Sequence, residues 1–267
     1  MQITNVAVDA CPKNGLDRLF AWLGKFNEAA SARLSCISYA WPKPDFGGAA
    51  FRNQIATEAL EARLQSRTAA VRRMFSEDAI FSHGMVEWCS GVGTPEEAIL
   101  EHLYTSDLLV TIAEVDEECV TPDPVDLAIR SGTPVLRLKR GVEANPIGVA
   151  VIAWKDCASS RRALHSSLNL LSSAGRIHIV GAGDEISAAR LEQVVGYLGS
   201  RGLTAQAVHL PDRNNKPGAE IIVHALDCGA DVLISGVKGE RGLRDRLFGN
   251  ATRQFAECSE FSWYLSG

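Results

Sequence analysis

Several features are missing from this 267-residue sequence, and each absence argues against a class of protein. No apolar run reaches membrane-spanning length, so no transmembrane helix and no membrane partner are predicted. A secretory signal needs an unbroken apolar segment, but the first twenty residues carry charged side chains at Asp9, Lys13, Asp17 and Arg18. We therefore expect a cytoplasmic protein.

Metal-binding and hydrolase motifs are also missing. The seven cysteines never form a C-x-x-C pair and are odd in number, which favours reduced thiols over a zinc site or a disulfide framework. The six histidines show neither H-E-x-x-H nor another ligand spacing, and surface or capping roles are favoured for them. No G-x-S-x-G segment is present to support a hydrolase. The sequence therefore predicts no metal site and no catalytic residue.

The charge balance lacks the positive excess typical of a nucleic-acid-binding protein. There are 27 Lys and Arg against 32 Asp and Glu, which gives a net charge of -5. The apolar content of 46% and the charged content of 22% are those of an ordinary globular protein. The length fits one large domain or two ordinary ones.

Short apolar runs alternate with helix-like segments along the whole chain. The segment 54–75 has apolar residues at helical spacing with Arg and Glu between them, which predicts a helix. This alternation is typical of α/β proteins with doubly wound, mostly parallel sheets. The expected strands lie within residues 5–10, 32–40, 106–113, 133–139, 148–154, 176–182, 204–210, 230–236 and 262–266.

The two halves of the sequence resemble each other. The segment "VAVDAC" matches "IAWKDC" at an offset that places Asp9 opposite Lys155, and "SDLLVTIA" matches "ADVLISGV" farther on. A Gly-, Pro- and Asn-containing linker at 139–148 separates the halves. We therefore predict two similar domains in tandem, at residues 1–145 and 146–267.

A glycine pattern follows one strand of the second half. Gly236 comes directly after "DVLIS", and Gly239 and Gly249 follow at the spacing G-x-x-G-x9-G before a predicted helix. Ligands of doubly wound sheets bind beyond the carboxyl ends of the strands. Glycines allow close approach, and helix starts attract anions. The pattern therefore predicts a phosphate-binding loop.

This loop, "SGVKGERGLRDRLFGNATRQF", resembles the ATP-binding signature of the universal stress protein family. The segment "VIAWKDCASSRRAL" resembles the first strand and helix start of the same family, and segments of the first half resemble the degenerate leading domain of tandem members. The resemblance covers nearly the whole chain. It implies an adenine nucleotide alpha hydrolase-like fold in each half.

The resemblance also implies where a nucleotide binds in the second half. The end of the second strand, at Val180, is expected beside adenine. Lys155 stands where the family commonly has an acidic residue, and three roles stay open for it: neutralising phosphate, filling the pocket, or pairing with Asp156 or another carboxylate. The phosphates are expected against the last strand residue and the loop ends: Ser235, Gly236, Gly239, Gly249, Asn250, Ala251 and Thr252.

The first half lacks the equivalent loop. No glycine follows Val110, and the segment carries the acidic residues Glu114, Asp116, Glu117 and Glu118. Negative side chains repel phosphate. We therefore expect the first domain to have lost the nucleotide site.

These features favour binding of ATP or another adenine nucleotide, with stress-response signalling and Mg²⁺ only together with the nucleotide. No general base is evident beside the loop, so little or no hydrolysis is expected, with weak ATPase activity as the upper limit. The alternative is a tandem scaffold or interaction module whose degenerate pocket stays empty. Cys157, beside the loop, is expected to be a half-buried strand-end thiol rather than a redox sensor.

The last predicted strand of each half has little sequence after it. Such strands lie at sheet edges, where unpaired backbone groups invite pairing. The resemblance implies that the strands at 133–139 and 261–266 pair within the chain, so that the two domains form a pseudo-twofold internal dimer. A further homodimer of the whole chain is left open.

Overall fold

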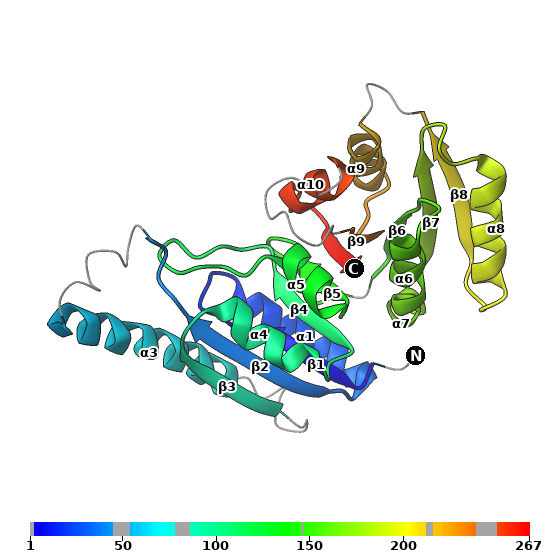
Figure 1. Ribbon diagram of the computed structural model, residues 1–267. Coiled ribbons are helices and arrows are strands. Elements are labelled where there is room, and N and C mark those ends of the chain that lie inside the picture. The colour runs from blue at the N-terminus through cyan, green and yellow to red at the C-terminus, as the bar shows by residue number, and fades with distance from the viewer. Residues whose placement is uncertain (1–2, 45–53, 78–85, 146, 212–215, 239–249) are drawn as a thin grey trace. The chain divides into compact units, whose positions relative to one another are not determined.

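The computed structural model describes residues 3–44, 54–77, 86–145, 147–211, 216–238 and 250–267 (Figure 1). These residues form two compact units. The leading unit contains Ile3–Leu127 and Arg140–Ala144, and the trailing unit contains Ala128–Lys139 and Asn145–Gly267. Residues 128–139 therefore group with the second half, while a domain boundary at residue 145 stays a prediction from sequence.

The leading unit contains a parallel sheet in the order β3-β2-β1-β4. Helices alternate with these strands along the chain. The strands are β1 (Asn5–Asp9), β2 (Arg33–Ala40), β3 (Val86–Val92) and β4 (Leu108–Ile112), and the helices are α1 (Leu16–Ala30), α3 (Gln54–Glu77), α4 (Pro95–Leu103) and the first turn of α5 (Pro124–Ser131).

The trailing unit repeats this arrangement in the order β5-β10-β9-β6-β7-β8. All neighbours are parallel except β5 and β10. The strands are β5 (Val135–Leu138), β6 (Val149–Ala153), β7 (Arg176–Ala182), β8 (Ala205–Leu210), β9 (Val232–Gly236) and β10 (Ser262–Ser266). The helices are α6 (Ala158–Ser166), α7 (Leu168–Leu171), α8 (Ala188–Gly199), α9 (Pro217–Asp227) and α10 (Asn250–Glu257).

The predicted α/β class, with mostly parallel sheets, is confirmed. The central strands β1, β4, β6 and β9 are almost wholly buried, as expected of parallel strands covered on both faces. The predicted helix over 54–75 is present as α3, which packs on β2 and β3 with Leu64 and Val71 buried. None of the described helices is both long and apolar enough to cross a membrane.

One strand was not predicted. β3 reads "VEWCSGV", and its residues are half-buried or exposed. The strand pairs only with β2 among the described strands, so it lies at the edge of the leading sheet. Glu, Ser and Gly interrupt the apolar run that marks the other strands.

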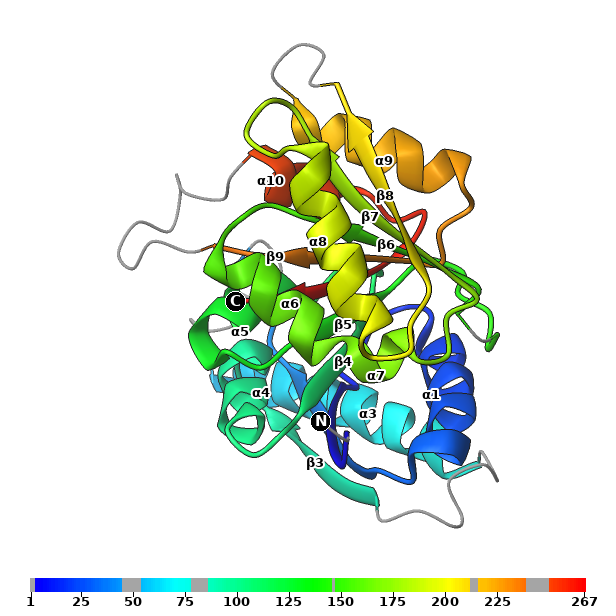
Figure 2. The same cartoon turned by 90° about the vertical axis from the view of Figure 1, so that its right-hand side faces the viewer.

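The strand order of the trailing unit reverses between β6 and β9. From β6 the chain first adds β7 and β8 on one side and then adds β9 and β10 on the other. Helices α6 and α8 consequently cover one face of this sheet, and α9 and α10 pack together on the other (Figure 2). Such a reversal is the usual ligand-binding point of a doubly wound sheet.

β5 and β10, the two strands expected at open edges, pair with each other. The register joins Val135 to Leu265 and Arg137 to Trp263 in an antiparallel ladder. The apolar residues of these two strand segments are all buried: Val135, Leu136, Leu138, Phe261, Trp263 and Leu265. Each strand thus satisfies an edge of the other.

The buried guanidinium of Arg137 anchors α10 to this pair of strands. It donates hydrogen bonds to the carbonyl oxygens of Phe255, Ala256 and Cys258, at 3.1, 2.6 and 2.5 Å. It also lies 5.2 Å from the ring centre of Trp263, within range of a cation–π contact. The last carbonyls of a helix lack partners within the helix, so Arg137 caps the carboxyl end of α10.

We predict that Arg137→Met lowers the free energy of unfolding by about 3 kcal/mol, because the substitution removes a charged donor from three carbonyls in the protein interior. Arg73→Met is the matched control, since Arg73 is exposed on α3, and it should change stability by less than about 0.5 kcal/mol. Urea denaturation measures both values. Equal losses in the two variants would show that the capping bonds contribute little.

Candidate functional site

The candidate site lies where the neighbouring strands β6 and β9 end. Ala153 is paired with Ser235, and Gly236 is the next residue of β9. The Ser235 side chain is buried, and its hydroxyl oxygen accepts a hydrogen bond from Nε1 of Trp263 at 2.8 Å. The protein therefore already uses this hydroxyl to fix the indole of β10.

Gly236 permits a close approach between β9 and the start of α6. A Cβ at Gly236 would lie 2.4 Å from the carbonyl carbon of Ser159 and 2.4 Å from the backbone nitrogen of Ser160. These contacts involve backbone atoms that no side-chain rotation can relieve. Any larger residue at position 236 would push the amino-terminal end of α6 away from the strand.

Cys157 is half-buried as predicted, but it is the N-cap residue of α6, four residues beyond the end of β6, so the predicted position at a strand end is wrong. Its sulfur lies 3.3 Å from the hydroxyl of Ser159 and 3.2 Å from that of Ser160. Burial raises the pKa of the Cys157 thiol, but hydrogen bonds from the side chains and backbone of these two serines outweigh it, so the net pKa is lowered.

Lys155 lies in the loop after β6 and pairs with Glu185. Both side chains are mostly exposed, at 65% and 73%. Of the three roles left open by the sequence, the structure shows an ion pair, with Glu185 as the partner. An exposed pair of this kind is weak, about 0–1 kcal/mol, and is readily exchanged for another partner.

Val180 lies buried in β7 beside Ala153. Its carbonyl oxygen accepts the backbone N–H of Trp154 at 2.8 Å. The indole of Trp154 is buried as well, which agrees with a core role, and it lines an open groove between α6 and α8 of about 420 Å³. Arg161, Arg190 and Tyr197 also line this groove.

The remaining site residues belong to the glycine-rich loop and α10. Gly239 and Gly249 lie outside the described residues. Asn250 is the first residue of α10, and Thr252 is buried. Ala251 packs against α9, where a Cβ at Gly218 would lie 2.7 Å from the Ala251 Cα. The predicted helix after the last glycine is therefore present and packed.

The corresponding strand ends of the leading unit hold a buried ion pair. Lys13 pairs with Asp9, and their side chains are only 1% and 2% exposed. The Thr111 hydroxyl donates to Asp9 Oδ2 at 2.7 Å and accepts from Lys13 Nζ at 3.1 Å. Burial raises the pKa of Asp9, but Lys13 and the hydrogen bonds from Lys13, Thr111 and Cys11 outweigh it, so the net pKa is lowered.

Hydrogen-bond register corrects the predicted match between the halves. The N–H of Ala10 bonds to the strand residue paired with Asp9, and the N–H of Trp154 bonds in the same way to the residue paired with Ala153. Asp9 therefore corresponds to Ala153, not Lys155. The segment match was two residues out of register because the strand end and the following loop differ in composition between the halves.

The same strand register also aligns the last residues of β4 with those of β9. Val8 is paired with Val110, and Ile152 is paired with Ile234. At the strand ends, Thr111 and Ile112 of the leading unit therefore correspond to Ser235 and Gly236. The same residue offset, continued into the loop after the strand, places Lys13 opposite Cys157.

In both units a glycine lies where the strand end meets the start of the following helix. It belongs to the strand in one unit and to the helix start in the other. In the trailing unit it is Gly236 on the strand, against Ser159 at the helix start. In the leading unit it is Gly15 at the helix start, where a Cβ would lie 3.1 Å from Cδ1 of Ile112 on the strand. Gly15 also has a φ of 75°, which favours glycine. The leading unit thus places a large side chain where the trailing unit keeps backbone alone.

Sequence reasoning missed a cluster formed by His178, His224 and Cys228. The expected surface or capping role is wrong for His178, which is buried in β7. His224 and Cys228 are four residues apart at the end of α9, a spacing that places both on one side of a helix and is visible in the sequence. His178 joins them only through the fold.

Solved structures identify this architecture. No protein-family model matches the sequence, and no curated protein matches it. A universal stress protein from Archaeoglobus fulgidus superposes with a TM-score of 0.71 at 13% identity, over 97% of both chains. The chain has the universal stress protein fold.

Two further structures share this fold. A protein from Pseudomonas aeruginosa described as a candidate universal stress protein matches with a TM-score of 0.59 at 16% identity, covering 99% of this chain and 93% of its own. The cytoplasmic domain of a prokaryotic cation chloride cotransporter matches with a TM-score of 0.50 at 12% identity, covering 100% and 95%. Because the universal stress protein fold occurs in such different proteins, function has to be argued from the site.

The buried ion pair of the leading unit gives a test of its structural role. We predict that Lys13→Met lowers stability by about 3–5 kcal/mol at pH 7, because Asp9 is left buried and charged. In Asp9→Asn/Lys13→Met no charge remains, so the loss should be much smaller. Urea denaturation of both variants measures the difference.

The contribution of Asp9 to stability should change with pH in opposite directions in the unchanged protein and in Lys13→Met. In the unchanged protein the lowered pKa of Asp9 makes its carboxylate stabilising above the ordinary value of 3.8, and this contribution is lost as pH falls below it. In Lys13→Met the lowering effects of Lys13 are gone and burial, the largest influence, raises the pKa of Asp9 against the remaining hydrogen bonds from Thr111 and Cys11, so stability relative to the double variant should rise as pH falls toward 3.8. A difference between the variants that is independent of pH would contradict the assignment.

Proposed function

We propose that the trailing unit binds an adenine nucleotide, such as ATP, at the carboxyl ends of β6 and β9, and that the bound state signals in a stress response. The observation that supports this most directly is the contrast between the two units. Where the leading unit has Asp9, Lys13 and Ile112, the trailing unit has Ala153, Cys157 and Gly236. Small, uncharged residues thus occupy a strand reversal typical of ligand sites.

The phosphates are assigned to the segment between Gly236 and α10. Backbone N–H groups at the first turn of α10 have no partners within the helix and carry its positive dipole end. The loop glycines Gly239 and Gly249 add close backbone approach. Lys155 can leave its exposed pair with Glu185 to meet a phosphate, and Mg²⁺ accompanies the nucleotide rather than occupying a site of its own.

Little or no hydrolysis is part of this proposal. Three carboxylates among the described residues follow β6 and β7 closely: Asp156, Asp184 and Glu185. Asp156 is held by Arg190 at 2.7 Å and by the indole of Trp154 at 3.1 Å, and Glu185 pairs with Lys155. A carboxylate held by a cation is a poor general base, so Asp156 in particular is unsuited to activate a water molecule. The nucleotide then acts as a signal carried by its bound state.

A scaffold that binds no nucleotide is the second candidate. It is favoured by the contacts that the strand ends already make within the protein. The Ser235 hydroxyl holds Trp263, and the Val180 carbonyl holds Trp154. In a scaffold these contacts would close the site permanently, and no adenine nucleotide would bind.

Calorimetry with ATP tests the proposal. We predict that Gly249→Val weakens ATP binding at least tenfold, because a β-branched side chain enters the space that the phosphates need. Gly199→Val is the matched control, since a Cβ at Gly199 meets no atom within 4 Å, and it should leave the affinity unchanged. Absence of ATP binding in the unchanged protein would favour the scaffold. Equal ATP affinity in Gly249→Val and the unchanged protein would show that the phosphate loop is wrongly assigned.

A further inference from the structure

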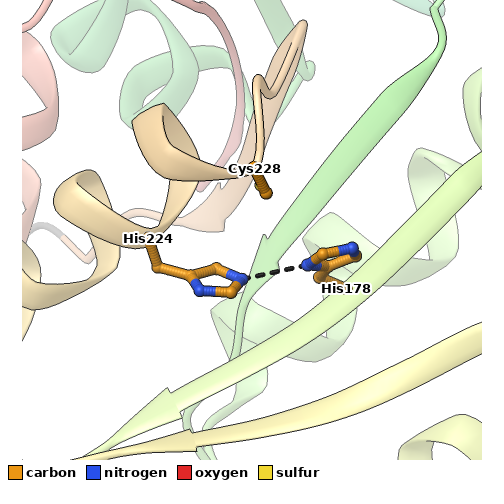
Figure 3. Close-up of side chains that lie close together, drawn as sticks. All are labelled: His178, His224 and Cys228. Atoms are coloured by element: carbon orange, nitrogen blue, oxygen red, sulfur yellow. Dashed lines mark hydrogen bonds between the residues drawn. The ribbon is translucent and has the colours of Figure 1, made fainter.

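Three side chains of types that can bind a metal lie close together on the face of the trailing sheet that α9 covers (Figure 3). His178 projects from β7, His224 from the last turn of α9, and Cys228 from the residue that ends this helix. We propose that these three side chains form a zinc-binding site that ties β7 to α9.

The spacing of the ligand atoms suits one small ion. Nδ1 of His178 lies 2.9 Å from Nε2 of His224, and the three ligand atoms all lie within 4.8 Å of one another. Tetrahedral zinc, with bonds of about 2.0–2.1 Å to nitrogen and about 2.3 Å to sulfur, separates its ligand atoms by about 3.3–3.6 Å. Small side-chain rotations, opening the nitrogen pair and drawing in the sulfur, produce that geometry.

A neighbouring amide is placed to orient one ligand. Nε2 of His178 lies 2.9 Å from the amide nitrogen of Gln206 on β8, the residue paired with His178. When Nδ1 binds a metal, Nε2 carries the proton and needs an acceptor. Turning the Gln206 amide over supplies its oxygen at the same place. Such outer hydrogen bonds fix the tautomer and direction of ligating histidines.

Local sequence and fold each supply part of the site. The four-residue spacing of His224 and Cys228 sets them on one side of the helix end. The parallel pairing of β6, β7 and β8 then places His178 beneath them.

The ligand set favours zinc over magnesium or calcium. Two imidazoles and a thiolate suit a borderline-soft ion, whereas Mg²⁺ and Ca²⁺ require oxygen ligands. Three protein ligands leave a fourth tetrahedral position for water, and His224 and Cys228 are only half-buried, which gives solvent access. The site is thus separate in chemistry from any Mg²⁺ bound with a nucleotide.

Cobalt substitution tests the site without reference to nucleotides. The full-length chain, kept reduced and stripped of metal, is titrated with Co²⁺, and thiolate coordination is read from the sulfur-to-cobalt charge-transfer absorption. We expect one Co²⁺ per chain with this absorption, its displacement by Zn²⁺, and a higher unfolding temperature with Zn²⁺. His224→Ala should weaken Co²⁺ binding by more than about a hundredfold, beyond the usual effect of losing an outer hydrogen bond.

Matched variants separate this site from other thiols and histidines. Cys228→Ser should retain weakened Co²⁺ binding without the charge-transfer absorption, whereas Cys258→Ser and His102→Ala should behave like the unchanged protein. Circular dichroism checks that each variant is folded. If a ligand variant does not fold, His178→Asn is tested in its place. The proposal is overturned if the unchanged protein takes up no Co²⁺, or if the absorption survives in Cys228→Ser.

Discussion

The antiparallel pairing of β5 with β10 is the contact on which the rest of the trailing unit depends. β5 comes from the first half of the sequence, yet it completes the edge of the sheet in the second half. Its Arg137 caps the carboxyl end of α10, and Trp263 of β10 is hydrogen-bonded to Ser235 at the end of β9. One strand pair therefore fixes both the strand end and the helix between which the proposed phosphate loop runs.

The two units show how one fold supports two different strand ends. The leading unit fills this position with a buried Asp9–Lys13 pair bridged by Thr111. A buried pair of this kind is costly to break, because removing either partner leaves the other charge buried and unpaired. The trailing unit replaces the pair with Ala153 and Cys157 and moves the glycine from the helix start to the strand. The same topology thus gives a closed core in one unit and a candidate ligand site in the other.

Much of this fold could be predicted from the sequence, because buried parallel strands appear in a sequence as continuous apolar runs. β7 and β10 were predicted to the residue, and α3 to within two residues. β3 was missed because an edge strand needs no such run. The pairing of β5 with β10 could be predicted only through the family resemblance, since it joins segments more than a hundred residues apart.

The candidate site was less predictable, because its features depend on distances that sequence spacing does not determine. The equivalence of Asp9 and Ala153 follows from backbone register, and the pairing of Lys155 with Glu185 joins two separate loops. The contact of His178 with His224 likewise crosses from a strand to a helix 46 residues later. In each case the sequence shows the residue types but not which residues lie next to them in space.

The central claim is that only one of the two strand ends accepts a nucleotide. Native mass spectrometry of the purified chain, titrated with ATP, counts the nucleotides bound to each chain directly. We predict saturation at one nucleotide per chain. Two nucleotides per chain would show that the leading unit is open despite its buried ion pair, and none would show that the trailing unit is closed as well.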